Sequence, residues 1–135
     1  MNIVITGGSG FVGSYLCERL INDGHNLIVV DNLLTGSKEN ISDLMDNDNF
    51  SFIEHDVQNH IEIENKVDYV LHFASAASPK AYTEHPVNTL KAGSIGTLNT
   101  LGLAKKHNSQ YLLASTSEVY GDPLISPQNE EYWGN

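Results

Sequence analysis

Short runs of β-branched and aliphatic residues alternate with amphipathic segments along the chain. The apolar runs lie at residues 3–6, 26–31, 50–54, 68–73 and 110–115, and polar or small residues flank each one. Runs of this length and composition are typical of buried strands. The last segment, residues 121–135, contains proline and glycine and predicts a loop.

The segments between these runs carry apolar residues at helical spacing. Phe11, Val12, Tyr15, Leu16 and Leu20 mark the apolar face of a first helix that ends at Asp23-Gly24. Ile41, Leu44 and Met45 predict a short helix after a turn at Thr35-Gly36. A long helix is expected from Pro86 to about residue 107, with Leu90, Leu98 and Leu101 on one face.

Strands that alternate with helices predict an α/β fold with a doubly wound parallel sheet. Right-handed crossovers favour the strand order 3-2-1-4-5, as in Rossmann-like domains. A complete fold of this kind continues with further strands and helices. We therefore expect residues 1–135 to be the front portion of a dinucleotide-binding domain in a larger protein.

A glycine-rich turn joins the first strand to the first helix. Glycines stand at positions 7, 10 and 13, and the second strand ends at Asp31. Gly7 permits a sharp turn, Gly10 lets a pyrophosphate approach the backbone, and Gly13 lets the helix pack closely on the sheet. The helix N-terminus offers free N–H groups to phosphates, and a carboxylate at position 31 accepts ribose hydroxyls. Because that carboxylate repels a 2′-phosphate, the pattern predicts NAD rather than NADP.

Bulk properties narrow the class of partner. The formal net charge is −10 and no stripe of Lys and Arg exists, which argues against nucleic acid or an anionic membrane. No apolar run approaches the ~20 residues of a membrane span. Cys17 is the single cysteine, so no disulfide framework is expected. Met1 leads directly into the first strand, and we expect a cytoplasmic protein.

Polar and small residues follow the later strands, at the edge where a ligand is expected. Asp56 and Val57 follow the third strand, although an acid there is also typical of a strand end or a helix cap. Small residues begin after Phe73, and they suit either a cofactor or helix packing. Residues 115–121 combine hydroxyls with a carboxylate, which suits acid–base chemistry or an ordinary Ser/Thr turn. His60, Glu62 and Glu64 alternate without a nearby fourth ligand, so no metal site is predicted.

With these motifs, the chain resembles the extended short-chain dehydrogenase/reductase family over essentially its whole length. Within that family it is most similar to the UDP-glucuronate decarboxylases. The resemblance rests on residues 6–13, Asp31-Asn32 with Thr35-Gly36, Ala77-Ser78-Pro79 with Tyr82, residues 96–99, residues 115–123 and residues 132–135.

The resemblance implies oxidation of UDP-glucuronate at C4 by bound NAD, loss of CO2 and re-reduction to UDP-xylose. It implies that Thr116 is the catalytic hydroxyl and that Glu118 assists the ring chemistry. Lys91 and Asn99 match positions near the nicotinamide and the sugar. The implied cofactor-binding residues are Gly7, Gly10, Phe11, Val12, Gly13, Asp31, Asn32, Thr35, Gly36, Asp56, Val57, Phe73, Ala74 and Ser75. A homodimer through the long helix is also implied.

Two departures accompany the resemblance. The Tyr-x-x-x-Lys pair of the family does not occur in residues 1–135, so this chain alone is expected to be inactive. Gly93 stands where many relatives have Asn. The alternatives are part of a dTDP-glucose 4,6-dehydratase or UDP-sugar 4-epimerase, or a non-catalytic nucleotide-binding module. Dehydratases usually have Asp where Ser117 stands, and epimerases usually lack an acid at position 118.

Overall fold

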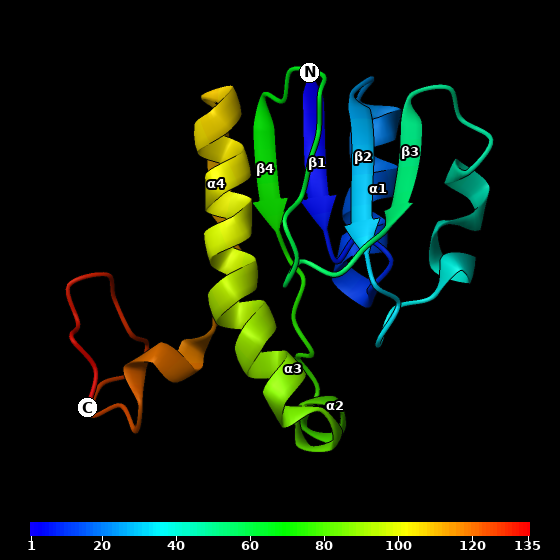
Figure 1. The fold of residues 1–135 in the computed structure, drawn as a ribbon. Helices are drawn as coiled ribbons and strands as arrows, with labels where there is room; N and C mark the ends of the chain where they lie inside the picture. The colour runs from blue at the N-terminus through cyan, green and yellow to red at the C-terminus, as the bar shows by residue number, and fades with distance from the viewer.

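The computed structural model describes residues 1–135 and contains one parallel sheet with the strand order β3-β2-β1-β4-β5. Figure 1 shows the sheet with β1 at its centre. The strands are β1 (Asn2–Thr6), β2 (Asn26–Asp31), β3 (Phe50–Glu54), β4 (Tyr69–His72) and β5 (Gln110–Leu113). The predicted fold class and strand order are confirmed. The fifth strand is shorter than expected and ends before Ala114.

Both faces of the sheet are covered, which is why the strands read as continuous apolar runs. Val4, Val30 and Val70 point to one face and pack with Leu103 of the long helix. Ile3, Ile5, Leu27 and Val29 point to the other face and pack around Cys17. The alternation along β1 follows from the two-residue period of a strand.

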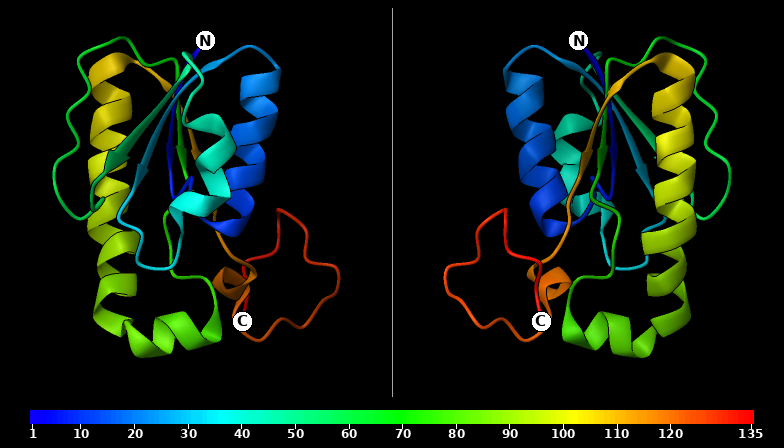
Figure 2. Two further views of the ribbon diagram at one scale, coloured as in Figure 1. Left: turned by 90° about the vertical axis from the view of Figure 1, so that its right-hand side faces the viewer. Right: turned by 90° about the vertical axis from the view of Figure 1, so that its left-hand side faces the viewer.

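One layer consists of α1 (Phe11–Asn22) and the 3₁₀ helix η1 (Lys38–Leu44), as Figure 2 shows. The predicted apolar face of α1 is only partly correct. Leu16 and Leu20 pack on the core, but Phe11, Val12 and Tyr15 are 78%, 59% and 65% exposed. The small residues Gly13 and Cys17 are the buried positions of this helix. They allow α1 to approach the sheet closely and turn the bulky residues at its start outward.

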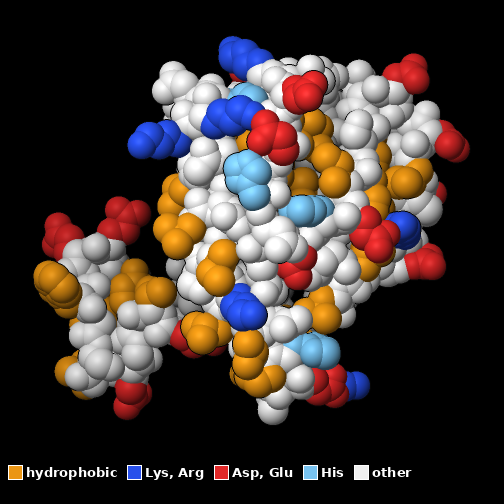
Figure 3. Space-filling view, in the orientation of Figure 1, with side chains coloured by type: hydrophobic (Ala, Val, Ile, Leu, Met, Phe, Trp, Pro, Cys, Tyr) orange, Lys and Arg blue, Asp and Glu red, His pale blue; other side chains and the backbone are white.

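The opposite layer is the long helical segment that was predicted from Pro86 to about residue 107. It consists of α3 (Pro86–Lys91), the π-turn η2 (Ala92–Gly96) and α4 (Thr97–His107), and the short helix α2 (Pro79–Glu84) precedes it. Thr100, Leu103 and Ala104 are its buried residues in α4. Leu90, Leu98 and Leu101 lie on the exposed side, where Figure 3 shows hydrophobic side chains along the helix. None of these helices combines the length and apolarity that crossing a membrane requires.

The last segment extends away from the sheet (Figures 1 and 2). After β5, the 3₁₀ turn η3 (Ser117–Tyr120) leads into the loop that was predicted for residues 121–135. The ends of this loop meet, because the Asn135 N–H donates to the Tyr120 carbonyl at 2.8 Å. The rings of Tyr120 and Tyr132 are stacked across it, with centroids 5.8 Å apart.

Candidate functional site

An open cleft of about 1110 Å³ lies at the carboxyl ends of the strands. Loops that follow all five strands contribute to its walls, together with α3 and the π-turn. All the predicted cofactor-binding residues and both predicted catalytic residues line it: Gly7, Gly10, Phe11, Val12, Gly13, Asp31, Asn32, Thr35, Gly36, Asp56, Val57, Phe73, Ala74, Ser75, Thr116 and Glu118. Parallel α/β sheets bind ligands at this edge, so the cleft is the candidate site.

At two positions of the glycine loop after β1, an added Cβ would collide with backbone atoms. Gly7 has φ +74°, and a Cβ on it would lie 2.7 Å from the Ala74 nitrogen. A Cβ on Gly13 would lie 2.2 Å from the Gly7 carbonyl oxygen. Gly10 differs, because a Cβ there would meet only that same oxygen, at 3.3 Å. The missing side chain at position 10 therefore opens the loop toward the cleft.

The N-terminus of α1 carries unused hydrogen-bond donors. Gly10 is the N-cap and provides no side-chain cap, and the first turn has no acidic residue. Ser14 donates the first bond of the turn, to the Gly10 carbonyl at 3.0 Å. The preceding N–H groups of Phe11, Val12 and Gly13 therefore have no helical acceptor. Together with the helix dipole they form a binding site for a phosphate.

Asp31 ends β2 and is buried beside the glycine loop, with 7% of its surface exposed. One carboxylate oxygen accepts from the Ser9 N–H at 2.9 Å, and the other accepts from the Leu33 N–H at 2.9 Å. Each oxygen has a further lone pair for a ribose hydroxyl. An anion-binding helix end next to a fixed carboxylate fits the pyrophosphate and ribose of NAD.

The loops after β2 and β3 form the end of the cleft where the adenosine of NAD is predicted to bind. The Asn32 amide donates to Asp56 at 3.0 Å and joins the two loops. Asp56 also accepts from the Gln58 N–H at 2.9 Å, within the turn that follows β3, and no helix begins there for it to cap. Gly36 packs against Ser9, whose carbonyl and Cβ would lie 3.0–3.1 Å from an added Cβ.

Thr116 and Glu118 lie on the opposite wall, at the turn after β5. Thr116 is the N-cap of η3, and its hydroxyl oxygen accepts from the Glu118 N–H at 3.3 Å. Because the oxygen accepts in this bond, the hydroxyl proton is free to donate to a ligand. Both side chains are exposed to the cleft.

Lys91 and Asn99 are not brought to the cleft. Lys91 is exposed on α3. The Asn99 amide donates to the carbonyls of Val57 and Asn59 at 2.8 and 3.0 Å, which ties α4 to the loop after β3. The position of these side chains does not support a substrate-binding role, which stays a prediction.

Sequence reasoning missed one wall of the cleft. Asn88 and Thr89 of α3, Ala92 of the π-turn and Thr97 of α4 all line it. Asn88 and Thr89 lie near the start of a helical segment that carries many other polar residues, so no local signal singled them out. Gly93 also lines this wall, and a Cβ on it would meet nothing within 4 Å. A side chain such as Asn would therefore have room at this position.

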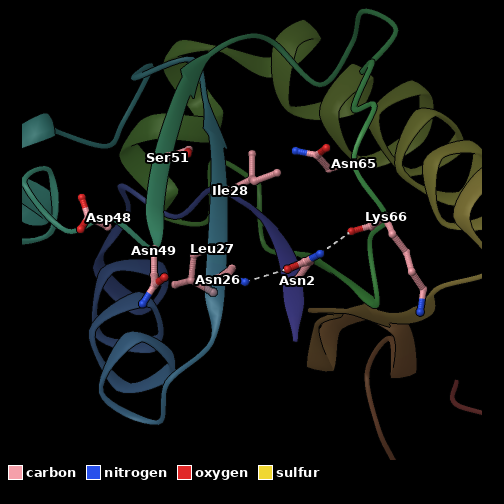
Figure 4. Close-up of a pocket in the computed structure, with 9 residues that line it drawn as sticks. All are labelled: Asn2, Asn26, Leu27, Ile28, Asp48, Asn49, Ser51, Asn65 and Lys66. Atoms are coloured by element: carbon pink, nitrogen blue, oxygen red, sulfur yellow. Dashed lines mark hydrogen bonds between the residues drawn. The ribbon is translucent and has the colours of Figure 1, made fainter.

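A second, polar cavity of about 340 Å³ lies at the amino ends of the strands (Figure 4). Here the Asn26 amide donates to Asn2 at 2.9 Å, and the Asn2 amide donates to the Lys66 carbonyl at 2.8 Å. No predicted site residue lies in it. The polar groups of these asparagines are used within the protein, which contrasts with the free N–H groups at the other end.

Comparison with known proteins supports the family that the sequence motifs predicted. UDP-glucuronic acid decarboxylase 1 of Danio rerio is 55% identical over 133 residues, which are 98% of this chain and 31% of that protein. UDP-glucuronic acid decarboxylase 4 of Arabidopsis thaliana is 54% identical over 100% of this chain and 30% of that protein. The chain thus spans about a third of the length of these curated relatives.

Solved structures give the same fold. A UDP-galactose 4-epimerase matches with a TM-score of 0.86 and 32% identity, over 100% of this chain and 45% of that one. UDP-glucose 4-epimerase from Bifidobacterium longum, in complex with NAD+ and UDP, matches with a TM-score of 0.80 and 27% identity, over 97% of this chain and 42% of that one. Residues 3–133 match the sequence pattern of the NAD dependent epimerase/dehydratase family. The expected family and its cofactor, NAD, are confirmed: the chain belongs to the NAD dependent epimerase/dehydratase family, within the extended short-chain dehydrogenases/reductases.

Proposed function

We propose that this chain is the NAD-binding front part of a UDP-glucuronate decarboxylase, which converts UDP-glucuronate to UDP-xylose and CO2. One observation carries the proposal. A single cleft joins the glycine loop and Asp31 to Thr116 and Glu118, in a chain 55% identical to a decarboxylase over 98% of its length.

The dinucleotide is bound mainly by backbone groups and one acid. The N–H groups at the start of α1 hold the pyrophosphate, which explains how a chain of net charge −10 binds an anion. Asp31 accepts the ribose hydroxyls, and Asn32 and Asp56 border the adenine. NAD, when bound, supplies the hydride acceptor for oxidation at C4 of the sugar and the donor for its re-reduction.

Thr116 and Glu118 act on the sugar from the opposite wall. The Thr116 hydroxyl donates a hydrogen bond to the C4 oxygen and orients it, and the threonine keeps its own proton. The Glu118 carboxylate, two residues further along the same turn, handles a proton of the ring. Small residues after β4, Ala74 and Ser75 among them, leave room for the nicotinamide between the two walls.

The 135-residue chain by itself is proposed not to turn over substrate, because the Tyr-x-x-x-Lys pair that deprotonates the C4 hydroxyl is not among its residues. In the complete enzyme, a homodimer would cover the exposed side of the long helix, where Val87, Leu90 and Leu98 are exposed.

A UDP-sugar 4-epimerase is the second candidate, because the solved structures that match this fold include UDP-galactose and UDP-glucose 4-epimerases. The two reactions differ in whether the carboxylate of UDP-glucuronate is lost. An epimerase would return a UDP-sugar that still carries it.

The test is incubation of the full-length protein with NAD and UDP-glucuronate, followed by proton NMR. We expect UDP-xylose. A product epimerised at C4 that retains the carboxylate, or interconversion of UDP-glucose and UDP-galactose in a parallel incubation, would support the epimerase instead. No product from any of these sugars would contradict both candidates.

Variants assign the chemistry to this chain's residues. Thr116→Val is expected to lower kcat by about 100-fold or more, and Thr116→Ser to retain most of it, because only the hydroxyl is required. Glu118→Gln is expected to lower kcat with little change in NAD affinity. A Thr116→Val variant with normal kcat would exclude this residue as the catalytic hydroxyl.

A further inference from the structure

A buried imidazole lies in the inner wall of the cleft, at the end of β4. His72 is 3% exposed, and its Nδ1 lies 2.6 Å from the hydroxyl oxygen of Thr6, the last residue of β1. Thr6 is itself fully buried. The backbone of Ala92, in the π-turn of the long helix, also interacts with the ring and acts to raise its pKa. One side chain therefore connects two strand ends and a helix.

The partners of the ring determine which nitrogen carries the proton. The contact with Ala92 favours the protonated ring, so the ring N–H donates and the Ala92 carbonyl accepts. Nδ1 is then the acceptor, and the Thr6 hydroxyl must donate to it. The Thr6 oxygen in turn accepts from the Ala74 N–H at 3.3 Å. The bonds run in one direction from Ala74 through Thr6 and His72 to Ala92.

Each end of this chain of bonds lies in a wall of the NAD cleft. Ala74 belongs to the loop after β4, whose backbone lies so close to Gly7 that a Cβ there would be 2.7 Å from the Ala74 nitrogen. Ala92 belongs to the helical wall that includes Gly93 and Thr97. Neither the Thr6 hydroxyl nor the imidazole has another partner that would fix these distances.

The π-turn provides the acceptor for the ring. A π-turn changes the i→i−4 pattern of hydrogen bonds and releases carbonyls from it. Gly96, at the end of the turn, is also adjacent to the ring, with an added Cβ 3.8 Å from His72 Cε1. Burial lowers the pKa of His72, so the ring is neutral at physiological pH and keeps its acceptor nitrogen.

We propose that neutral His72 is a positioning residue for the NAD site: through Thr6 it holds the loop after β4 against the glycine loop, and through Ala92 it holds the π-turn wall at a fixed distance from both. His72 borders the cleft, and its proposed role is exerted through Thr6 and Ala92 rather than by contact with the cofactor or the substrate. The proposal concerns NAD binding and is independent of the sugar chemistry proposed above.

The experiment measures the NAD dissociation constant by calorimetry, with the Tm, for variants of the full-length protein. Thr6→Ser keeps the hydroxyl and is expected to bind NAD within about twofold of the wild type, whereas Thr6→Val is expected to bind at least about tenfold more weakly. His72→Gln, which loses the acceptor at the Nδ1 position, should resemble Thr6→Val. Ser109→Ala removes a hydroxyl that donates to the Val67 carbonyl at 2.7 Å, away from the cleft, and is the matched control.

A purely structural role would lower the Tm of Thr6→Val and Ser109→Ala alike and leave NAD affinity unchanged in the folded protein. That result would overturn the proposal. Nitrogen-15 NMR of the wild-type protein shows which nitrogen of the His72 ring carries the proton. This measurement does not depend on whether any variant folds. The proton is expected on Nε2, and a proton found on Nδ1 of the neutral ring would contradict the direction of the bonds.

Discussion

The two ends of the sheet differ in whether their polar side chains are buried or exposed. At the carboxyl ends, the three central strands finish in the buried polar residues Thr6, Asp31 and His72. At the amino ends, β1 and β2 begin with Asn2 and Asn26, whose mutual hydrogen bond is exposed to solvent. Both ends belong to the same strands in the same register, so the difference in burial is a difference between their side chains.

Burial of a polar group is unfavourable unless it is hydrogen-bonded. Each buried group at the carboxyl end is bonded within the cleft walls: Asp31 to the Ser9 backbone, Thr6 to the Ala74 backbone, and His72 to the Thr6 hydroxyl. The exposed asparagines hold no loop of comparable function. Buried polar side chains at the carboxyl end therefore fix the positions of the loops around the cleft. The asparagines at the amino end only close the sheet.

The largest difference is expected between two helical glycines. Gly13→Ala would place a Cβ 2.2 Å from the Gly7 carbonyl oxygen and 2.8 Å from the Gly8 Cα, both of them backbone atoms that cannot move aside cheaply. We expect a loss of more than about 3 kcal/mol in the free energy of unfolding, together with loss of NAD binding. Urea denaturation and calorimetry measure the two effects.

Gly102→Ala is the matched control, because Gly102 lies within α4 and a Cβ there meets nothing within 4 Å. Alanine is the better helix former, so a gain of about 0.5–1 kcal/mol is expected, with NAD binding unchanged. Equal stability of the two variants would contradict the close contact between α1 and the glycine loop.

Two aspartates bonded to backbone provide the next comparison. Asp31 accepts from Ser9 at the carboxyl end, and Asp68 accepts from the Asn2 N–H at 2.9 Å at the amino end. Asp31→Asn is expected to weaken NAD binding by about tenfold or more and to reduce discrimination against NADP, because a charged acceptor is lost. Asp68→Asn should leave the affinity for NAD unchanged. Calorimetry with both dinucleotides measures this.

Asp68→Asn should instead change the response to acid. The Asn2 N–H, and then Lys66, hold the pKa of Asp68 below its ordinary value of 3.8. A carboxyl whose pKa is lowered by folding stabilises the protein above its unfolded pKa, and this contribution is lost as the pH falls through the folded value. Urea denaturation below about pH 4 should show a shallower loss of stability for Asp68→Asn than for the wild type. An identical loss of stability in acid for the two proteins would contradict the lowered pKa of Asp68.

The strands and their order could be predicted because buried parallel strands are continuous apolar runs, and handed crossovers leave few topologies. The glycine loop and Asp31 could be predicted because their chemistry is local in sequence. The side of α1 that faces the sheet could not be predicted. The spacing of Phe11, Val12 and Tyr15 fits a helix, but periodicity does not tell which side of it reaches the sheet. That side is set by the small residues Gly13 and Cys17.

The helical wall of the cleft depends on contacts distant in sequence. Val57 packs against Gly96, where an added Cβ would lie 2.7 Å from its side chain, and His72 binds Ala92. These contacts involve the π-turn or residues beside it, and no local sequence pattern predicted that turn. The position of Asn99 could not be predicted for the same reason. Its amide donates to the carbonyl of Val57, which is distant in sequence, and it does not line the cleft.

The smallest effect is expected at the amino end. Asn26→Ala removes the exposed hydrogen bond to Asn2, so the free energy of unfolding should fall by less than about 1 kcal/mol, because water replaces the lost partner. NAD affinity should not change, since neither residue reaches the cleft. Chemical denaturation and calorimetry on the same samples test both statements. If Asn26→Ala weakened NAD binding as Asp31→Asn does, the two ends would be coupled through β2, and the division of the sheet into a binding end and a closing end would be wrong.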